Sequence, residues 1–281
     1  MHFSNKYKSD IKTIIAKRYS NGGDYWATAD GRLTKEHPFS TLSATLTLAE
    51  LGVSPNNPIL KGSGKLILKS WRKDGRFRLA PSGTLYPCYT ASAARTLCRL
   101  GYANDTKLNK TFQHLLETQH NDGGWRCEKF FFGRGPETEF SNPEATLGAL
   151  DAFRYTKLLN KDKRLDKAVE SLLKHWVTRK PIGPCHYGIG TLFMQVEYPF
   201  FRYNLFYYVY VLSFYNKAKR DKRFLEALAS LESKLTGGKI IVENPHKKLA
   251  KFSFCEKGKP SDIATERYHR ILENIKGGKQ K

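Results

Sequence analysis

The cysteines are the residues of this chain best suited to carry chemistry. The sequence holds five of them among 281 residues. Cys127 lies two residues after a Gly-Gly-Trp turn, Cys185 directly precedes His186, and Cys88 follows a proline at the start of an apolar segment. Thiolate and imidazole are good zinc ligands, and three protein ligands leave one position open for a reacting group. The candidate metal ligands are therefore Cys127, Cys185, His186 and Cys88, and the candidate cofactor is zinc.

A purely structural role for the same cysteines is the competing interpretation. Cysteine is among the residue types most often buried, where it acts as a small apolar side chain. Cys98 lies in the middle of an apolar segment, so we expect it to fill the core, and Cys255 precedes another such segment. No C-x-x-C pair anchors a metal site, and five cysteines in a chain of this length do not indicate a disulfide framework.

A second set of reactive side chains lies in the turn-rich stretch of residues 133–142. Arg134 offers a guanidinium group that can hold a diphosphate or a carboxylate in bidentate fashion. Glu137, Glu139 or Glu144 would act as a general acid if burial raised its pKa, although a structural role is favoured for Glu144. Arg134, Glu137 and Glu139 are therefore the candidate catalytic residues.

Other polar residues have a simpler structural interpretation. Ser141 or Asn142 is suited to cap the next helix, and Glu144 is suited to its first turn, where a negative charge is favourable. Glu197 precedes a proline and lies five residues before Arg202, with which it can form an ion pair.

An internal repeat of helix pairs is expected to position all of these residues. Prolines precede five apolar helical segments at intervals of 49, 56, 56 and 61 residues, at Pro38, Pro87, Pro143, Pro199 and Pro260. Proline suits the first turn of a helix because its missing N–H would be unpaired there. Leu51-Gly52 and Leu100-Gly101 end the first two segments, as glycine at a helix C-terminus predicts.

Each proline is preceded by a glycine-containing loop, and each loop by a more charged amphipathic helix. The segments after the prolines are richer in small and apolar residues, as expected for inner helices. About five such pairs can close into a ring or stack as an open solenoid. In a closed ring, the loops that carry the cysteines gather at one end.

The clearest copy of the repeat covers residues 119–125 and reads QHNDGGW. It matches the glutamine–tryptophan repeat of the terpenoid cyclases. The layout of residues 10–276 resembles the (α/α) toroid superfamily, which includes squalene cyclases and the β subunits of protein prenyltransferases. The resemblance implies an all-α fold, an (α/α) toroid or barrel of about five helix-pair repeats. We expect one domain over residues 1–276 and a flexible basic tail over residues 277–281.

The functional motifs of these families are incomplete. The sequence has neither the D-x-D-D motif of class II cyclases nor the D-D-x-x-D motif of class I terpene synthases. Cys88 matches the zinc-binding cysteine of protein prenyltransferases, but Tyr86 replaces the expected aspartate. Cys127 and the pair Cys185-His186 resemble, over two short motifs, the zinc ligands of lanthionine cyclases, with the first cysteine displaced by one residue.

Aromatic residues are concentrated between residues 193 and 210. They could line a pocket for an isoprenoid-like or other apolar substrate and stabilise a carbocation through their π faces. Alternatively, they fill the interior of the ring.

The composition limits the partners of the chain. A formal net charge of +22 predicts attraction to polyanions, including an anionic membrane surface, although no nucleic-acid-binding motif is present. The alternative is that these charges only form a solvated surface. The sequence contains no run of about 18 apolar residues, which a membrane-spanning helix would need. Its first residues also lack the apolar core of a signal peptide. We therefore expect a cytoplasmic protein, with peripheral membrane contact as an alternative.

Three functional hypotheses follow. The first is a prenyltransferase-like or terpene-cyclase-like enzyme that holds an apolar substrate in the ring and uses zinc to activate a substrate thiol. The second is a non-catalytic scaffold whose basic surface binds an acidic partner, a membrane or nucleic acid. The third is a terpene cyclase that uses a non-standard acid from the loop containing Glu137 and Glu139.

Overall fold

A computed structural model describes residues 3–82, 85–127 and 132–277. Within these ranges the chain forms thirteen α-helices, two short 3-10 helices and one two-stranded antiparallel hairpin, which confirms the all-α class. The predicted tail beyond residue 277 lies outside the described residues. The α-helices are α1 (Phe3–Lys6), α2 (Lys8–Ala16), α3 (Thr41–Glu50), α4 (Pro58–Lys69), α5 (Pro87–Arg99), α6 (Thr106–Glu117), α7 (Pro143–Phe153), α8 (Lys163–Thr178), α9 (Thr191–Met194), α10 (Leu205–Leu212), α11 (Asn216–Lys219), α12 (Lys222–Glu232) and α13 (Asp262–Gly277). The remaining elements are η1 (Pro136–Glu139), η2 (Lys247–Leu249), β1 (Leu235–Thr236) and β2 (Lys239–Ile240).

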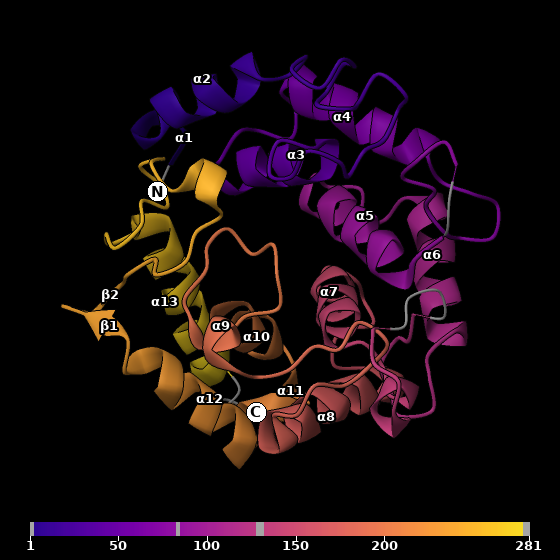
Figure 1. Cartoon of the computed structure of the whole chain (residues 1–281), viewed down its shortest axis with the longest axis vertical. Helices are drawn as coiled ribbons and strands as arrows, with labels where there is room; N and C mark the ends of the chain where they lie inside the picture. Colours follow the sequence, from indigo (N-terminus) through magenta and orange to yellow (C-terminus); the bar gives the residue numbers. More distant parts are fainter. Residues whose placement is uncertain (1–2, 83–84, 128–131, 278–281) are drawn as a thin grey trace.

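The helices follow one another around a common centre, alternating between an outer and an inner position (Figure 1). We call α3, α5, α7 and α10 the inner helices, and α2, α4, α6, α8 and α12 the outer helices. Neighbouring inner helices pack on one another, and each inner helix also packs on an outer helix. Every residue of α10 is buried, whereas α8 buries one face only, as the sequence predicted for inner and outer helices.

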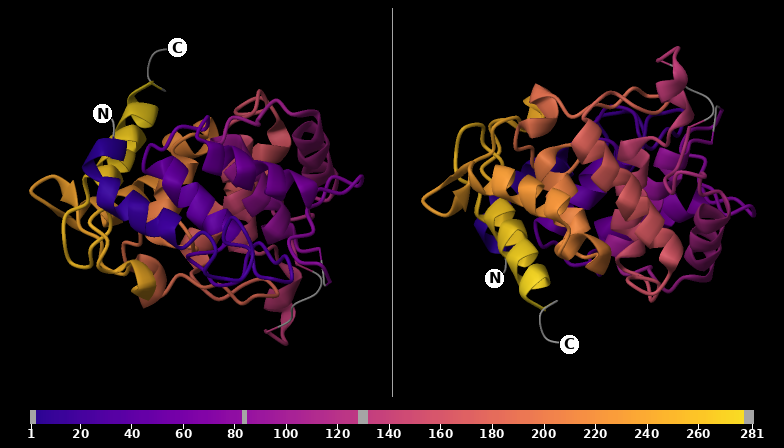
Figure 2. Two further views of the ribbon diagram at one scale, coloured as in Figure 1. Left: turned by 90° about the horizontal axis from the view of Figure 1, so that it is seen from above. Right: turned by 90° about the horizontal axis from the view of Figure 1, so that it is seen from below.

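The first and last segments of the chain contact each other. The rings of Tyr7 and Phe254 lie 6.2 Å apart, and the Ser253 hydroxyl donates to Asp10 over 2.6 Å. Lys6 forms an ion pair with Asp262, and α1 lies beside α13 in both views of Figure 2. These contacts connect the two ends of the circuit of helices.

Two of the five predicted prolines begin their helices, and the other three, including Pro260 before α13, precede their helices by two to six residues. Pro87 and Pro143 are the first residues of α5 and α7. By contrast, α3 begins three residues after Pro38 and α10 begins six residues after Pro199. The later starts have a physical cause, because side-chain caps determine where these helices begin. The Ser40 side chain accepts from the Ser43 N–H, and the Asn204 side chain accepts from the Tyr207 N–H.

The Gly-Gly-Trp turn of residues 123–125 packs between neighbouring helix pairs. The indole of Trp125 is buried, and its Nε1–H donates to the Leu115 carbonyl oxygen over 2.7 Å. Trp26 repeats this contact in the first pair, donating to the Ile14 carbonyl oxygen over 2.9 Å. The Gln119 amide donates to the Arg164 carbonyl oxygen over 2.8 Å and so ties the end of α6 to the start of α8.

The aromatic residues around α10 pack against one another. The ring of Phe200 lies 5.1 Å from that of Tyr207 and 5.0 Å from that of Tyr210, and all three side chains are buried. These residues therefore fill the interior, which was the alternative to a substrate pocket at this place. In the part of the chain that the structure describes, every helix is too short or too polar to cross a membrane.

Candidate functional site

Three cysteines from three separate segments interact at the end where α5 and α7 begin. Cys88 is the second residue of α5, Cys127 follows the Gly-Gly-Trp turn, and Cys185 lies in the loop after α8. A hydrogen bond with Cys127, followed by burial, raises the pKa of the Cys185 thiol. Burial likewise raises the pKa of Cys88 to about 12, with further contributions from Glu144 and Cys127. Cys88 and Cys185 are therefore uncharged at neutral pH in the absence of a cation. We call the side chains of Cys88, Cys127 and Cys185 the thiol cluster.

One carboxyl group, that of Glu144, adjoins the thiol cluster, and a second, that of Glu197, interacts with Glu144. The Tyr187 hydroxyl donates a hydrogen bond to Oε2 of Glu144, which lies in the first turn of α7. Burial raises the pKa of Glu144, as does the nearby Glu197, against the lowering effects of Tyr187 and Arg202. Glu144 is therefore a carboxyl group that holds its proton to higher pH than an exposed glutamate.

Glu197 has an unmet hydrogen-bonding requirement. Its side chain is only 5% exposed, and its Oε2 accepts from Nε of Arg202 over 2.7 Å, as the sequence predicted. Its Oε1 is buried without a hydrogen-bond partner among the described residues. A buried carboxylate oxygen without a partner is costly, which indicates a place where a ligand or a proton belongs.

The thiol cluster matches zinc in the type of its donors but does not form a closed metal cage. Among the described residues, no three His, Cys, Asp or Glu side chains are arranged so that they could hold a metal ion as they stand. His186 is 44% exposed, and its Nε2 lies 3.7 Å from a carboxylate oxygen of Glu137. The predicted ligand set is therefore divided: the thiols of Cys88, Cys127 and Cys185 interact with one another, whereas His186 faces Glu137.

Cys98 and Cys255 are not part of the thiol cluster. Cys98 is buried in the middle of α5, which confirms its predicted role as core filler. The Cys255 thiol donates to the Leu249 carbonyl oxygen over 3.4 Å and interacts electrostatically with Asp10. The expectation that Cys255 joins the other cysteines is wrong, because its segment packs against the N-terminal helices.

The predicted catalytic residues of the 133–142 loop are placed on its accessible side. Arg134 is exposed. Glu139 has a side chain 75% exposed and lies 3.4 Å from Arg126. Backbone N–H groups, including that of Gly135, lower the pKa of Glu137, and so does His186. A general acid at this place needs a pKa that burial has raised. Glu144 meets this condition, whereas Glu137 does not.

A mostly apolar groove of about 770 Å³ lies beside the thiol cluster. It runs between α8, the start of α7 and the loops on either side of them, and its walls include Phe140, Leu172 and Ile182. Glu137 and His186 lie at its edge, so the groove and the thiol cluster share the loop that carries Cys185 and His186. The groove has the size and lining of a small-molecule site.

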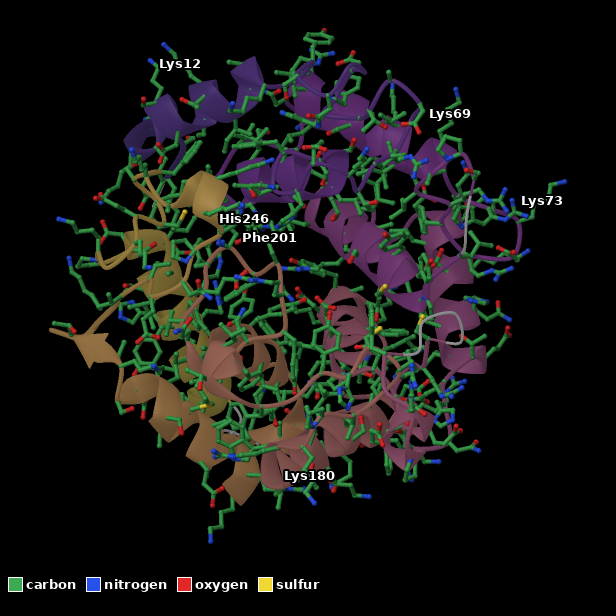
Figure 3. All side chains as sticks on the ribbon, in the orientation of Figure 1. Lys12, Lys69, Lys73, Lys180, Phe201 and His246 are labelled. Atoms are coloured by element: carbon green, nitrogen blue, oxygen red, sulfur yellow. The ribbon has the colours of Figure 1, made fainter. Side chains whose placement is uncertain are left out.

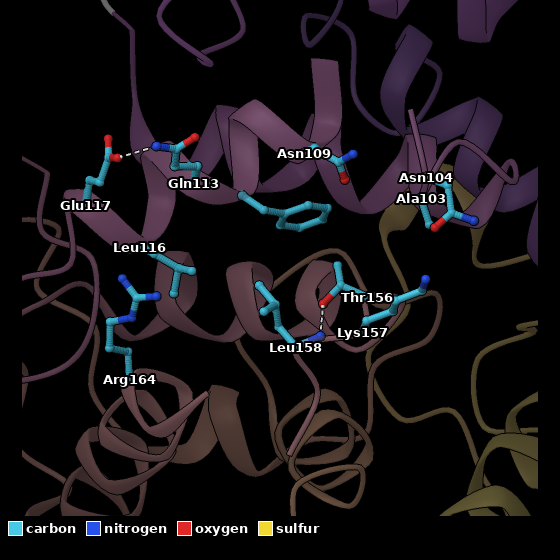
Figure 4. A pocket seen from close by; sticks show the side chains of 11 residues that line it. Ala103, Asn104, Asn109, Gln113, Leu116, Glu117, Thr156, Lys157, Leu158 and Arg164 are labelled. Atoms are coloured by element: carbon cyan, nitrogen blue, oxygen red, sulfur yellow. Dashed lines mark hydrogen bonds between the residues drawn. The ribbon is translucent and has the colours of Figure 1, made fainter. Parts of the chain in front are cut away.

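Another cavity, of about 560 Å³, lies at the opposite end of the inner helices (Figure 4). It is lined by α6, by residues that follow the C-terminal end of α5, such as Asn104, and by residues that follow α7, such as Lys157. Gln113 and Glu117 are hydrogen-bonded to each other over 2.7 Å at its wall. This cavity therefore includes none of the residues of the thiol cluster.

The sequence did not reveal that Glu144 would adjoin the cysteines. Glu144 was interpreted as a first-turn residue in preference to a general acid, and Glu197 as the partner of Arg202; the first-turn position and the ion pair are both correct. One signal was available in the sequence: Glu144 directly follows a proline that begins an apolar helix, as Cys88 does.

No protein-family model matches the chain, and a comparison with curated proteins finds no match.

Proposed function

We propose that this chain is an (α/α) toroid enzyme of the prenyltransferase and terpenoid-cyclase kind, with thiol chemistry at the end of the inner helices that carries the cysteines. The observation that carries the proposal is the interaction of Cys88, Cys127 and Cys185, which come from three different segments. A core cysteine needs apolar neighbours only, whereas Cys88 and Cys185 interact electrostatically with Glu144 and Tyr187.

The cluster would hold a zinc ion through Cys88, Cys127 and Cys185. Since burial keeps the thiols protonated, a divalent cation supplies the charge that would make three neighbouring thiolates stable. When bound, such an ion lowers the pKa of a coordinated substrate thiol and presents it as a nucleophile. Tyr187 would hold the Glu144 carboxyl group in place, where it can give or take a proton.

An apolar substrate fits the groove beside the cluster. The groove of about 770 Å³ offers Phe140, Leu172 and Ile182 to an isoprenoid-like chain. Its edge carries Lys174 and Lys180, which favour a substrate with an anionic end. The aromatic residues around α10 take no part in this site because they are packed into the core.

Metal content tests the proposal. We expect untagged protein, purified without chelator and supplied with zinc, to hold about one zinc per chain. Cys127→Ser and Cys185→Ser should each lose most of it, whereas Cys98→Ala, a change at a buried cysteine outside the cluster, should retain it. Alkylation of the wild-type cysteines by iodoacetamide should be slower with zinc than after chelation, because bound thiolates are shielded.

Two results would contradict the zinc site. One is protein that holds no zinc after supplementation although its far-ultraviolet circular dichroism shows folded helices. The other is equal zinc content in Cys127→Ser, Cys185→Ser and Cys98→Ala. Either result would leave Cys88, Cys127 and Cys185 as structural residues.

A second candidate function is favoured by one observation, the raised pKa of Glu144. A carboxyl group that holds its proton can act as the acid that starts a polyprene cyclisation. Glu144 would then replace the aspartic acid of the D-x-D-D motif, which this sequence lacks. Glu144→Gln should abolish such a cyclisation, whereas Glu139→Gln, at an exposed position, should leave it unchanged. A failure of the wild-type protein to cyclise polyprenes would end this alternative.

A further inference from the structure

A separate cavity of about 240 Å³ lies between the inner helices α3 and α5 and the segment that precedes α10. Its lining is mixed, and Leu42, Leu46, Phe200 and Phe201 form the apolar part. Because water takes up about 30 Å³ per molecule, the cavity has room for a small ligand. Its polar lining consists of Thr34, His37, Ser40, Ser43, Tyr89, Ser92, Arg95 and Thr96. None of these residues belongs to the thiol cluster.

The cavity exposes polar positions of an otherwise buried helix. Ser92 is exposed in the middle of α5, where an inner helix packed shut would bury it. Arg95 follows at i+3, on the same side of the helix, and Ser43 of α3 lines the opposite wall. Polar side chains of both inner helices therefore reach this cavity, where a ligand could contact them.

Arg95 is a buried cation with capacity to bind a ligand. Its side chain is 14% exposed, its Nε forms an ion pair with Asp151, and its Nη1 donates to the Phe200 carbonyl oxygen over 2.9 Å. Its guanidinium carbon also lies 4.7 Å from the centre of the Tyr207 ring. Asp151 is also the ion-pair partner of Arg154, so one carboxylate is shared between two guanidinium groups. Glu50, a second carboxylate that acts electrostatically on Arg95, is paired with Arg99 and Arg267, so guanidinium groups outnumber carboxylates here.

Other cationic and polar groups surround the mouth of the cavity. Nδ1 of His37 lies 2.7 Å from the Ser43 hydroxyl oxygen, and the ring of His37 lies 5.0 Å from that of His246. Figure 3 shows His246 and Phe201 near the centre of the circuit of helices. Arg202 and Lys248 act electrostatically on both histidines.

The acidic groups near this mouth already have cationic partners. Glu197 is paired with Arg202, and Glu36 lies 3.6 Å from Lys248. The remaining positive field favours an anion at the cavity.

We propose that this cavity binds a small oxyanion, the phosphate or carboxylate group of a soluble molecule. Arg95 would supply the charge, and the hydroxyl groups of Ser43 and Ser92 would donate hydrogen bonds. This site is independent of the thiol cluster and of the metal proposed there.

Calorimetric titration with inorganic phosphate and with citrate, at constant ionic strength, tests the site. We expect wild-type protein to bind at least one of the two anions at millimolar concentration or below. Ser92→Asp places a negative charge in the cavity without disturbing the core, and we expect it to weaken binding at least about tenfold. Ser92→Ala removes one of the proposed donors without adding a charge, so it should weaken binding less than Ser92→Asp does.

Ser9→Asp is the matched control, because it makes the same charge change at an exposed position of the outer helix α2. It should bind the anions as the wild-type protein does. Phosphate binding without citrate binding would assign a phosphorylated ligand, and the reverse would assign a carboxylate. The proposal is overturned if folded wild-type protein binds neither anion, or if Ser9→Asp weakens binding as much as Ser92→Asp. Cys127→Ser should bind the anions normally, which separates this test from that of the thiol cluster.

Discussion

The Tyr187 hydroxyl group donates a hydrogen bond to the Glu144 carboxylate. This contact joins residues 43 positions apart in sequence and connects the loop of Cys185 to the first turn of α7. It holds a carboxyl group of raised pKa beside the thiol cluster. The organisation of the candidate site therefore depends on a phenol that no sequence motif marks.

Tyr187→Phe should destabilise the fold and loosen this loop. The change leaves a partly desolvated carboxyl group without its donor, for which we expect a loss of about 1–3 kcal/mol in the free energy of unfolding. Urea denaturation followed by circular dichroism measures it. Tyr19→Phe, at a side chain 61% exposed, is the control and should change stability by less than about 0.5 kcal/mol. Equal effects of the two changes would show that the hydrogen bond makes no net contribution to the free energy of unfolding.

The ion pair of Arg267 and Glu50 should be a main connection between the last helix and α3. Nη2 of Arg267 lies 2.6 Å from Oε2 of Glu50, and the two side chains are 11% and 12% exposed. Arg267→Met removes one partner of a buried pair, for which we expect a loss of about 3 kcal/mol, since Arg99 still contacts Glu50. Arg270→Met, at a position 57% exposed, should cost less than about 1 kcal/mol. Thermal and urea unfolding of both variants would reveal whether the last helix is held in this way.

Lowering the pH should reduce the free energy of unfolding because Glu50 loses its ion pairs when it is protonated. Burial alone would raise the pKa of this carboxyl group, but Arg267 and Arg99 outweigh burial and lower it below its usual value. A lowered pKa means that Glu50 contributes stability above the unfolded-state pKa of about 4.3 and loses it as the pH falls further. Between pH 7 and pH 3, Glu50→Gln should therefore show a shallower decline in the free energy of unfolding than wild type. Parallel declines in the two proteins would assign acid sensitivity to other groups.

Gly123→Ala should be much more costly than Gly101→Ala. Both glycines have positive φ angles, +97° and +92°. A Cβ at Gly123 would lie 2.5 Å from the Lys167 carbonyl oxygen, whereas a Cβ at Gly101 meets nothing within 4 Å. Gly101→Ala should cost about 1–2 kcal/mol for its left-handed backbone alone, and Gly123→Ala about 1–3 kcal/mol more for the clash with α8. Similar midpoints of urea denaturation for the two variants would contradict a structural role for the QHNDGGW turn.

Local features of the fold were predictable because short-range physics sets them. Asn142 caps α7, and Gly52 and Gly101 follow the C-terminal ends of α3 and α5 with positive φ angles. The starts of α3 and α10 were predicted less well, because Ser40 and Asn204 compete with the prolines as boundary signals. The alternation of more and less apolar segments correctly indicated the inner and outer helices.

The candidate site was predictable only in part, because its members come from different helix pairs. Since Cys88, Cys127 and Cys185 occupy related places in the repeat, the sequence indicated that they would meet. Cys255 and His186 occupy similar places, yet one packs near Asp10 and the other faces Glu137. The direction of each side chain depends on the packing of its loop, which repeat spacing does not encode.

The sequence by itself determined the all-α class, the inner and outer helices and the high positive charge, since composition and periodicity carry that information. Only the tertiary structure decided that the aromatic residues around α10 fill the core, that burial raises the pKa of Glu144 and of Glu197, and that a cavity opens over Arg95. The physical reason is burial. A residue's pKa and its access to a ligand depend on how far water is excluded around it, and that depends on contacts between segments far apart in the chain.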